Sequence, residues 1–276
     1  MLFFRKYEPA DHQKDLIREF QILHMKWEEA DPLPPPFITC LANTEQNLYF
    51  YPKDHIKVLE YPDDEGFTAP IANITGPKNR PVGLKFGRDY LMIKIAFQPT
   101  GLYRLLKIPM QKTVNAGLNA IDFLPADIPV IIGQLERSVS YEEMIEVVSG
   151  FIDRQIEAGV LPEDPLDQVS IKMLDPLAKH NLPDWASEAC LSLRQFGRNF
   201  TKRVGISPKM YLRIVRFEHA MKIKNSSPEK SWSMIALECE YNDSSHLLRE
   251  FREFAEFPPG TLLQKQTSGY GDFPTG

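Results

Sequence analysis

The sequence predicts a multidomain α+β protein, in which a strand-rich N-terminal part precedes an all-helical C-terminal part. Three observations support this prediction. Apolar residues alternate over 90–97, helix-capping residues precede apolar runs of helical spacing from residue 140 onward, and two segments near the C-terminus each read as helix, turn and helix. At 276 residues the chain is long enough for two domains with separate cores.

Strand signals dominate the first 125 residues or so. Three segments have strand composition, namely residues 46–51, 55–61 and 90–97. Alternation in the last one places four apolar side chains on one face: Leu91, Ile93, Ile95 and Phe97. Gly and Asp in 86–90 predict a hairpin turn before that strand, and the proline-rich 31–36 is expected to be a loop or an edge.

A long helix follows, because Ser140 and Glu143 form a capping box. Apolar residues then recur at helical spacing, at Met144, Val147, Val148, Phe151, Ile152 and Ile156. This broad apolar face predicts either a homodimer interface or a cover for the sheet of the same chain. Gly159, Pro162 and Pro165 end the helix, so we expect one domain over 1–160 and another over 165–265.

The C-terminal helices carry clear start signals. Four residues are candidate N-caps: Asn181, Ser192, Ser207 and Asp243. Four apolar residues of the helix after Ser192 are expected to face the core: Leu193, Phe196, Phe200 and Val204. The next helix runs to about Asn225, on the order of 26 Å. A connector of this length can hold two recognition helices about one DNA turn apart, roughly 34 Å.

The two segments that read as helix-turn-helix units are residues 189–200 and 236–251. Charge supports this interpretation. Residues 1–170 carry 17 Lys and Arg against 25 Asp and Glu, whereas residues 171–265 carry 15 against 11. An acidic part beside a basic part is typical of a chain that meets a polyanion with one region only.

Other composition features exclude several classes. No apolar run reaches the length of a membrane span, and the first residues lack the apolar region of a secretory signal. Cys40, Cys190 and Cys239 form no CxxC pair, so we expect buried thiols and a cytoplasmic protein.

At these helix-turn-helix residues the chain resembles an AraC/XylS-type transcription regulator. The resemblance covers about residues 165–263 and is carried by the stretch 204–217 and by the pattern over 236–251 with Phe257-Pro-Pro259. It implies two helix-turn-helix units that bind double-stranded promoter DNA at the bacterial nucleoid. RNA polymerase is a further expected partner, together with a small-molecule effector of unknown identity and a second copy of the chain.

The resemblance also implies which residues contact DNA. The first recognition helix would present Arg194, Gln195, Arg198 and Asn199, and the second Ser244, Ser245, His246 and Arg249. Arginine is the usual reader of guanine, and Ser and His more often contact phosphates. The alternatives are a solvated face for the first helix and a capping or packing role for His246. Gly197 and Glu240 depart from the family pattern, because a longer side chain and a glycine are usual there.

The N-terminal part is similar, more loosely, to the cupin-like sensor domains of some of these regulators. The similarity lies in 76–81 and 97–106 and implies a small β-barrel followed by helices. Four aromatic residues are candidates for an apolar ligand pocket: Tyr49, Tyr51, Phe97 and Tyr103. They could equally fill the barrel.

The alternative function is a cupin-type metal enzyme fused to a DNA-binding domain. Such metal sites need several converging histidines and a carboxylate. The chain has six histidines, none closely spaced, and it lacks phosphate-loop, dinucleotide-binding and nucleophile-elbow motifs. We therefore expect a regulator and not an enzyme, with no catalytic residue, no metal and no cofactor.

Overall fold

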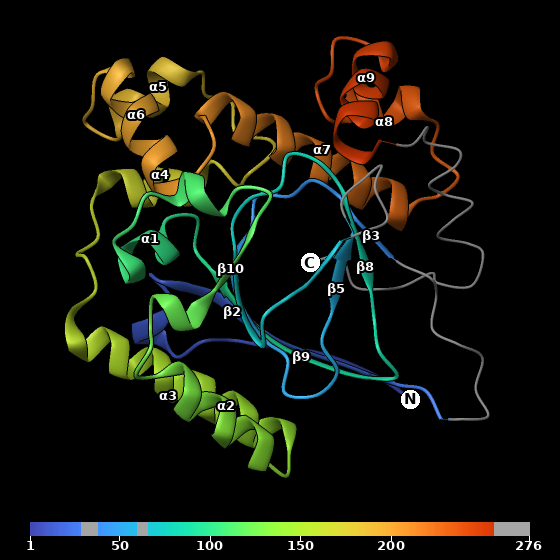
Figure 1. Ribbon diagram of the computed structural model, residues 1–276. Helices are drawn as coiled ribbons and strands as arrows, with labels where there is room; N and C mark the ends of the chain where they lie inside the picture. Colours follow the sequence, from blue (N-terminus) through green and yellow to red (C-terminus); the bar gives the residue numbers. More distant parts are fainter. Residues whose placement is uncertain (29–37, 60–65, 257–276) are drawn as a thin grey trace.

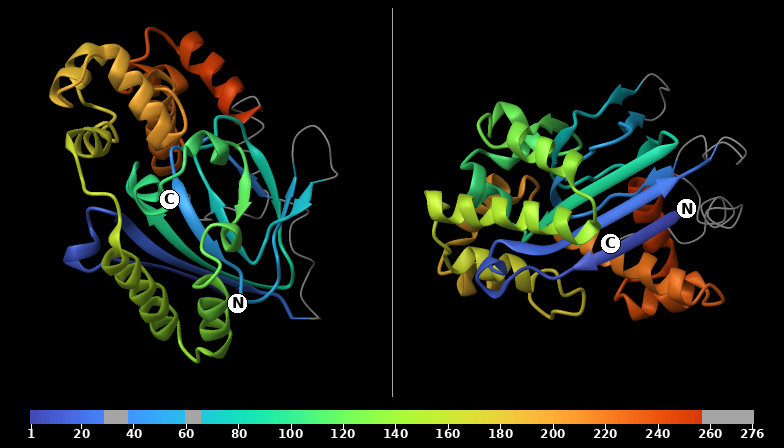
Figure 2. Two further views of the ribbon diagram at one scale, coloured as in Figure 1. Left: turned by 60° about the vertical axis from the view of Figure 1, so that its left-hand side comes forward. Right: turned by 90° about the horizontal axis from the view of Figure 1, so that it is seen from below.

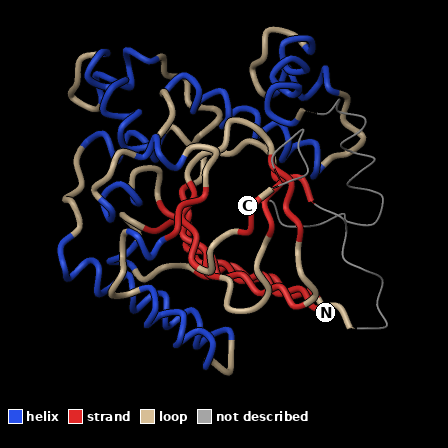
Figure 3. Tube along the Cα trace, viewed as in Figure 1, coloured by secondary structure: helices blue, strands red, loops and turns tan. Residues whose placement is uncertain are grey.

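The computed structural model describes residues 1–28, 38–59 and 66–256, and it places a strand-rich N-terminal part beside a helical C-terminal part (Figure 1). The proline-rich segment 31–36 lies outside the described residues, as do the last residues of the strand expected over 55–61. Figure 3 shows the strands together in the N-terminal part, which also carries helices, whereas the C-terminal part is helical.

The strands form two antiparallel sheets. The larger sheet has the order β1 (Leu2–Tyr7), β2 (Ile17–Lys26), β9 (Asp89–Phe97), β4 (Gln46–Phe50), β7 (Ala72–Thr75) and β10 (Gly117–Asn119). The smaller sheet has the order β3 (Ile38–Cys40), β8 (Val82–Lys85), β5 (Lys57–Leu59) and β6 (Phe67–Thr68). The N-terminal part is thus rich in sheet, as Figure 2 shows. The two sheets share no strand in the described ranges, so the structure does not show the closed barrel that the sequence predicts.

Strand β9 confirms the predicted alternation. Its four apolar residues from Leu91 to Phe97 are buried in one core, while Tyr90, Met92 and Lys94 point to the opposite face. The hairpin expected at 86–90 is wrong, because this turn leads from β8 in the smaller sheet to β9 in the larger one. Gly and Asp specify a chain reversal, but they do not specify which strand becomes the hydrogen-bonded neighbour.

Helices cover one face of the larger sheet (Figure 1). They are α1 (Gly101–Leu106), α2 (Ile128–Arg137) and α3 (Tyr141–Gly159), with short 3-10 turns η1 (Asp11–Gln13), η2 (Met110–Thr113) and η3 (Ala120–Asp122). Ser140 caps α3 as predicted, since its side chain accepts from the N–H of Glu143 at 3.2 Å. The apolar face of α3 packs into the core of its own chain, where Phe151 is fully buried.

The C-terminal part contains α4 (Pro165–Lys172), α5 (Leu182–Glu188), α6 (Leu193–Val204), α7 (Pro208–Ser226), α8 (Trp232–Glu238) and α9 (Ser244–Ala255). All four predicted N-caps accept a hydrogen bond from the first turn of their helix. Leu193 is a correction: it is 51% exposed, because it is the first residue of α6 and lies beyond the core that buries Phe196, Phe200 and Val204. No described helix is long and apolar enough to cross a membrane.

The burial of α3 leads to a prediction. Replacing Phe151 by alanine leaves a cavity in a closely packed core and should lower the free energy of unfolding by about 3–5 kcal/mol. Urea unfolding followed by circular dichroism measures this. Val130→Ala, on the exposed side of α2, is the matched control and should change the stability by less than about 0.5 kcal/mol. A tolerated Phe151→Ala would show that this face is not core.

Candidate nucleic-acid interface

The two predicted turns have the same backbone geometry. Cys190 and Glu240 occupy the left-handed region, with φ of 56° and 55°. In the first turn the N–H of Leu191 donates to the carbonyl of Ala186 at 2.9 Å. In the second turn the N–H of Tyr241 donates to the carbonyl of Ala236 at 2.8 Å. α5–α6 and α8–α9 are therefore two copies of one unit, joined by α7.

Neither turn uses glycine at its left-handed position. The turn keeps its left-handed conformation although Glu240 stands where the family pattern has glycine. Holding a residue with a side chain in this conformation costs on the order of 1 kcal/mol. Cys190 was expected to be buried, but it is exposed. The left-handed residue of such a turn projects away from the helices. Cys239 is buried and Cys40 is half-buried.

Helix α6 presents an exposed basic face. Arg194, Gln195 and Arg198 are exposed, and Asn199 is half-buried. Neither arginine forms an ion pair with a described residue. Gln195, in contrast, is engaged in the helix cap, because its Oε1 accepts from the N–H of Ser192 at 3.0 Å and from its hydroxyl at 2.7 Å. Its Nε2 remains a donor, so the two-sided contact that glutamine makes to adenine would require breaking this cap.

Gly197 lies on the same helix and leaves an open space. A Cβ built at this position meets no other group within 4 Å. The glycine is therefore not required by packing, and its position on α6 is available to a longer side chain of the kind that the family pattern shows there.

Helix α9 differs from α6, because its outer residues are partly engaged. Ser245 and Arg249 are exposed, and Ser244 is half-buried. His246 is half-buried, with its Nε2 3.6 Å from the carboxylate of Glu250 and its ring edge-on to Tyr241. Asp243 caps the helix by accepting from the N–H of His246 at 2.7 Å.

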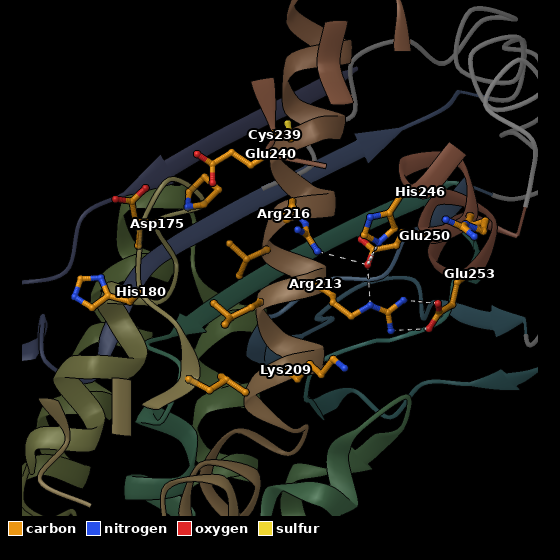
Figure 4. Close-up of a pocket in the computed structure, with 16 residues that line it drawn as sticks. Asp175, His180, Lys209, Arg213, Arg216, Cys239, Glu240, His246, Glu250 and Glu253 are labelled. Atoms are coloured by element: carbon orange, nitrogen blue, oxygen red, sulfur yellow. Dashed lines mark hydrogen bonds and ion pairs between the residues drawn. The ribbon is translucent and has the colours of Figure 1, made fainter. Parts of the chain in front are cut away.

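A charged cluster ties α9 to the connector helix α7 (Figure 4). The carboxylate of Glu250 is only 3% exposed and accepts from Nε of Arg213 at 2.8 Å, with Arg216 at 3.7 Å. Arg213 also donates to Glu253 at 3.1 Å. The hydrogen bond to Glu253, with further help from Glu250, raises the pKa of Arg213 above its usual range. The cluster thus fixes the second recognition helix against the connector.

This cluster lines a surface pocket of about 680 Å³ between the two units. Figure 4 shows the arginines of α7 at its centre, His180 on one side and the α9 carboxylates on the other. The cluster could not be predicted from the sequence, because Arg213 and Glu250 are 37 positions apart and no local pattern pairs them.

A second cavity of about 570 Å³ lies between the two sheets and the C-terminal half of α7. Of the four candidate pocket residues, Tyr49 and Tyr51 line this cavity, and the centroids of their stacked rings are 6.0 Å apart. The structure places the other two candidates elsewhere. Phe97 points to the core on the opposite face of β9, and Tyr103 lies on α1 against Lys202 and Arg203 of α6. The expected lining is corrected at these two positions.

Buried charges lie where this cavity meets α7. Lys94 contacts the carboxylate of Glu45 at 2.6 Å, and Arg18 forms a second ion pair with it. Burial alone would raise the pKa of Glu45, but the two cations outweigh burial and hold it well below its usual range. Glu218 of α7 accepts from the Thr44 hydroxyl at 3.0 Å, and burial together with Glu45 raises the pKa of Glu218 to about 7.

The three N-terminal histidines do not converge. His12 contacts Asp153, His24 lies between Asp89 and Tyr141, and His55 contacts a backbone carbonyl. In the ranges that the structure describes, no group of three His, Cys, Asp or Glu side chains is placed to hold a metal ion.

The strained second turn generates a prediction. Glu240→Gly should raise the free energy of unfolding by about 0.5–1 kcal/mol, because glycine reaches the left-handed region without the side-chain penalty. Glu240→Ala keeps the penalty and should bring no such gain. Both variants remove a negative charge and should bind DNA more tightly at low salt. Equal stabilities of the two variants in thermal unfolding would show that the turn stores no strain.

Glu218 generates a pH prediction. Between pH 4.5 and 7 the unfolded chain has lost this proton while the native protein keeps it, so the unfolding free energy falls as the pH rises. The contribution is at most about 1.4 kcal/mol per pH unit. Glu218→Gln should remove this slope and add about 1–3 kcal/mol at pH 8. Glu157→Gln, on the exposed side of α3, is the control and should leave the pH profile of urea unfolding unchanged.

One comparison with protein families covers the C-terminal part of the chain. Residues 185–265 match the family described as a helix-turn-helix domain. No curated protein matches the chain. Among solved structures, ToxT from Vibrio cholerae O395 is similar at 13% identity, with 90% of this chain and 98% of ToxT covered and a TM-score of 0.45.

Two further structures are similar. The DNA-binding domain of AdpA, solved with a target DNA, shares 25% identity over 38% of this chain and 94% of its own, with a TM-score of 0.35. The AraC-like transcriptional activator CuxR shares 12% identity over 91% of this chain and 80% of its own, with a TM-score of 0.25. The family match over 185–265 and the two equivalent turns agree that the C-terminal part of the chain is a helix-turn-helix domain.

Proposed function

We propose that α6 and α9 enter two successive major-groove segments of promoter DNA and that a small molecule in the inter-sheet cavity regulates this binding. The observation that carries the proposal is the equivalence of the two turns, down to their left-handed residue and hydrogen bonds. The 19 residues of α7 span about 28 Å, which is compatible with two recognition helices roughly one DNA turn apart.

In this proposal the two recognition helices have different tasks. Arg194 and Arg198 read guanines, because their guanidinium groups are exposed and form no ion pair with a described residue. Gln195 donates a hydrogen bond to the DNA from Nε2 alone. Asn199 makes a further contact to the DNA from the same helix. On α9, Ser244 and Ser245 hold phosphates, and Arg249 and His246 complete the contacts. The α6 unit then supplies most of the sequence discrimination.

The effector part of the proposal rests on the cavity. Its volume lies within the range of small-molecule sites. Its wall combines the rings of Tyr49, Tyr51 and Tyr90 with aliphatic side chains from both sheets, which favours a largely apolar molecule. The two sheets then serve as a cupin-like sensor domain within residues 1–160, and residues 165–265 serve as the DNA-binding domain.

The proposal extends to partners and location. The protein acts in the cytoplasm at the bacterial nucleoid and contacts RNA polymerase at the promoter. A homodimer can form only through surfaces other than the apolar face of α3, because Phe151 is buried within its own chain. Val130 of α2 and Val139 before α3 are large apolar residues that are exposed in this region.

The alternative function, a cupin-type metal enzyme fused to a DNA-binding domain, receives no support from the described residues. Each of His12, His24 and His55 has its own separate partner. Metal analysis of the purified protein tests the alternative directly, since stoichiometric iron, manganese or zinc would favour it.

Selection from random duplexes with the full chain tests the DNA-binding proposal. We expect enrichment of sites with two conserved elements about 10 base pairs apart, bound with an affinity that falls steeply with salt because counterions are released. Failure to prefer any duplex over random DNA at moderate salt would contradict sequence-specific binding.

Arg198 provides a test at the level of one residue. Arg198→Ala should weaken binding of the selected duplex by about 1–3 kcal/mol and relax discrimination at one base position. Arg137→Ala, an exposed arginine on α2, removes the same charge far from α6 and should leave binding unchanged. Competition binding against single-base variants of the site is the measurement. A uniform loss over all duplexes would make Arg198 a phosphate contact instead.

A further inference from the structure

The segment from the end of β3 to the first residue of β4 lies where the inter-sheet cavity meets the DNA-binding domain. We propose that residues 41–46, here called the coupling segment, transmit occupancy of the cavity to both helix-turn-helix units. This inference rests on the proposed function, and it identifies the part of the chain through which a bound molecule would change DNA affinity.

The coupling segment forms part of the cavity wall. Leu41, Ala42, Asn43 and Glu45 line the cavity. The backbone of Asn43 pairs with Lys78, another cavity residue, through two hydrogen bonds of 2.9 Å. An occupant of this end of the cavity therefore contacts the segment directly.

The same segment makes polar contacts with three helices of the DNA-binding domain. The N–H of Ala42 donates to the carbonyl of Phe254 in α9 at 3.2 Å. The hydroxyl of Thr44 donates to Glu218 in α7 at 3.0 Å. The connector and the second recognition helix are thus both held by residues two positions apart.

The first recognition helix is held by Gln46. Its Nε2 donates to the carbonyls of Arg203 and Val204 at 3.0 and 3.2 Å, at the last turn of α6. Gln46 is 1% exposed, and Ala42 is buried in the hydrophobic core of the DNA-binding domain. Since the last carbonyls of a helix lack intrahelical donors, burial makes these contacts costly to break. The segment and the C-terminal ends of α6 and α9 therefore move together.

Two other contacts between the parts of the chain provide comparisons. Tyr103 of α1 packs under Lys202 and Arg203 of α6, at 5.5 and 5.7 Å, but it does not line the cavity. Met221 and Lys222 of α7 line the cavity themselves, so α7 offers a second route from the cavity to the DNA-binding domain. If the segment transmits occupancy, the change in DNA affinity on filling the cavity does not need Tyr103, and contacts of the cavity with α7 alone do not produce it.

The experiment fills the cavity in the full chain and measures the Kd of the selected duplex. Met92, which lines the cavity from β9, is replaced by tryptophan as a permanent occupant. The probe 1-anilinonaphthalene-8-sulfonate, added to the wild type, is an independent occupant that does not depend on folding of the variant. Either occupant should change the Kd for DNA by at least about fivefold.

The test of the segment is the same measurement in Thr44→Val/Gln46→Leu. Cavity filling should then change the Kd by less than about twofold, although the probe still binds. The control Tyr103→Leu should retain the full response. Circular dichroism and thermal unfolding verify that each variant folds.

Three results would overturn the inference. A full response in Thr44→Val/Gln46→Leu would show that α7 transmits occupancy directly. Loss of the response in Tyr103→Leu would show that the whole interface between the N-terminal part and the DNA-binding domain transmits occupancy. Absence of any response to both occupants, in a wild type that binds its duplex specifically, would remove the coupling while leaving the proposed function intact. Failure of the proposed function is distinguishable, because the wild type would then show no preferred duplex.

Discussion

The largely buried carboxylate of Glu45, whose side chain is 13% exposed, makes the interactions on which the arrangement of the two parts of the molecule depends. It comes just before β4 and pairs with Lys94 of β9 and Arg18 of β2, so it links three neighbouring strands of the larger sheet. A buried carboxylate without these cations would be strongly unfavourable, and the ion pairs therefore fix this position of the chain. The flanking residues Thr44 and Gln46 are then directed toward α7 and α6.

This arrangement places a second acid, Glu218, next to the first. The negative charge of Glu45 and burial both favour the protonated form of Glu218, which the Thr44 hydroxyl contacts. The contact between the sheets and the connector helix therefore contains a carboxyl group whose pKa is raised to about 7. It is also sensitive to anything that enters the cavity, since Glu45 and Glu218 both line it.

The two helix-turn-helix units share a backbone design but differ in electrostatics. The arginines at the outer face of α6 are exposed, whereas around α9 the guanidinium groups of Arg213 and Arg216 are engaged by Glu250 and Glu253. Those pairs stabilise the orientation of α9 at the expense of positive charge available to DNA. This difference supports the proposal that the first unit reads bases and that the second holds a fixed position on the duplex.

The sequence alone was sufficient for features with a local cause. N-caps at Ser140, Ser192 and Asp243, the alternation in β9 and the positions of both turns all follow from interactions within a few residues. Leu193 shows the limit of this reasoning, because the helical period marks it as apolar but does not say where the core ends.

Only the tertiary structure decided which distant residues meet. The turn at 86–90 leads into a different sheet, Phe97 faces away from the cavity, and α3 covers its own chain. The pairs Glu45–Lys94, Thr44–Glu218 and Arg213–Glu250 join residues 49, 174 and 37 positions apart. Such contacts depend on strand order and on how the two parts of the chain pack, and no short-range propensity encodes either.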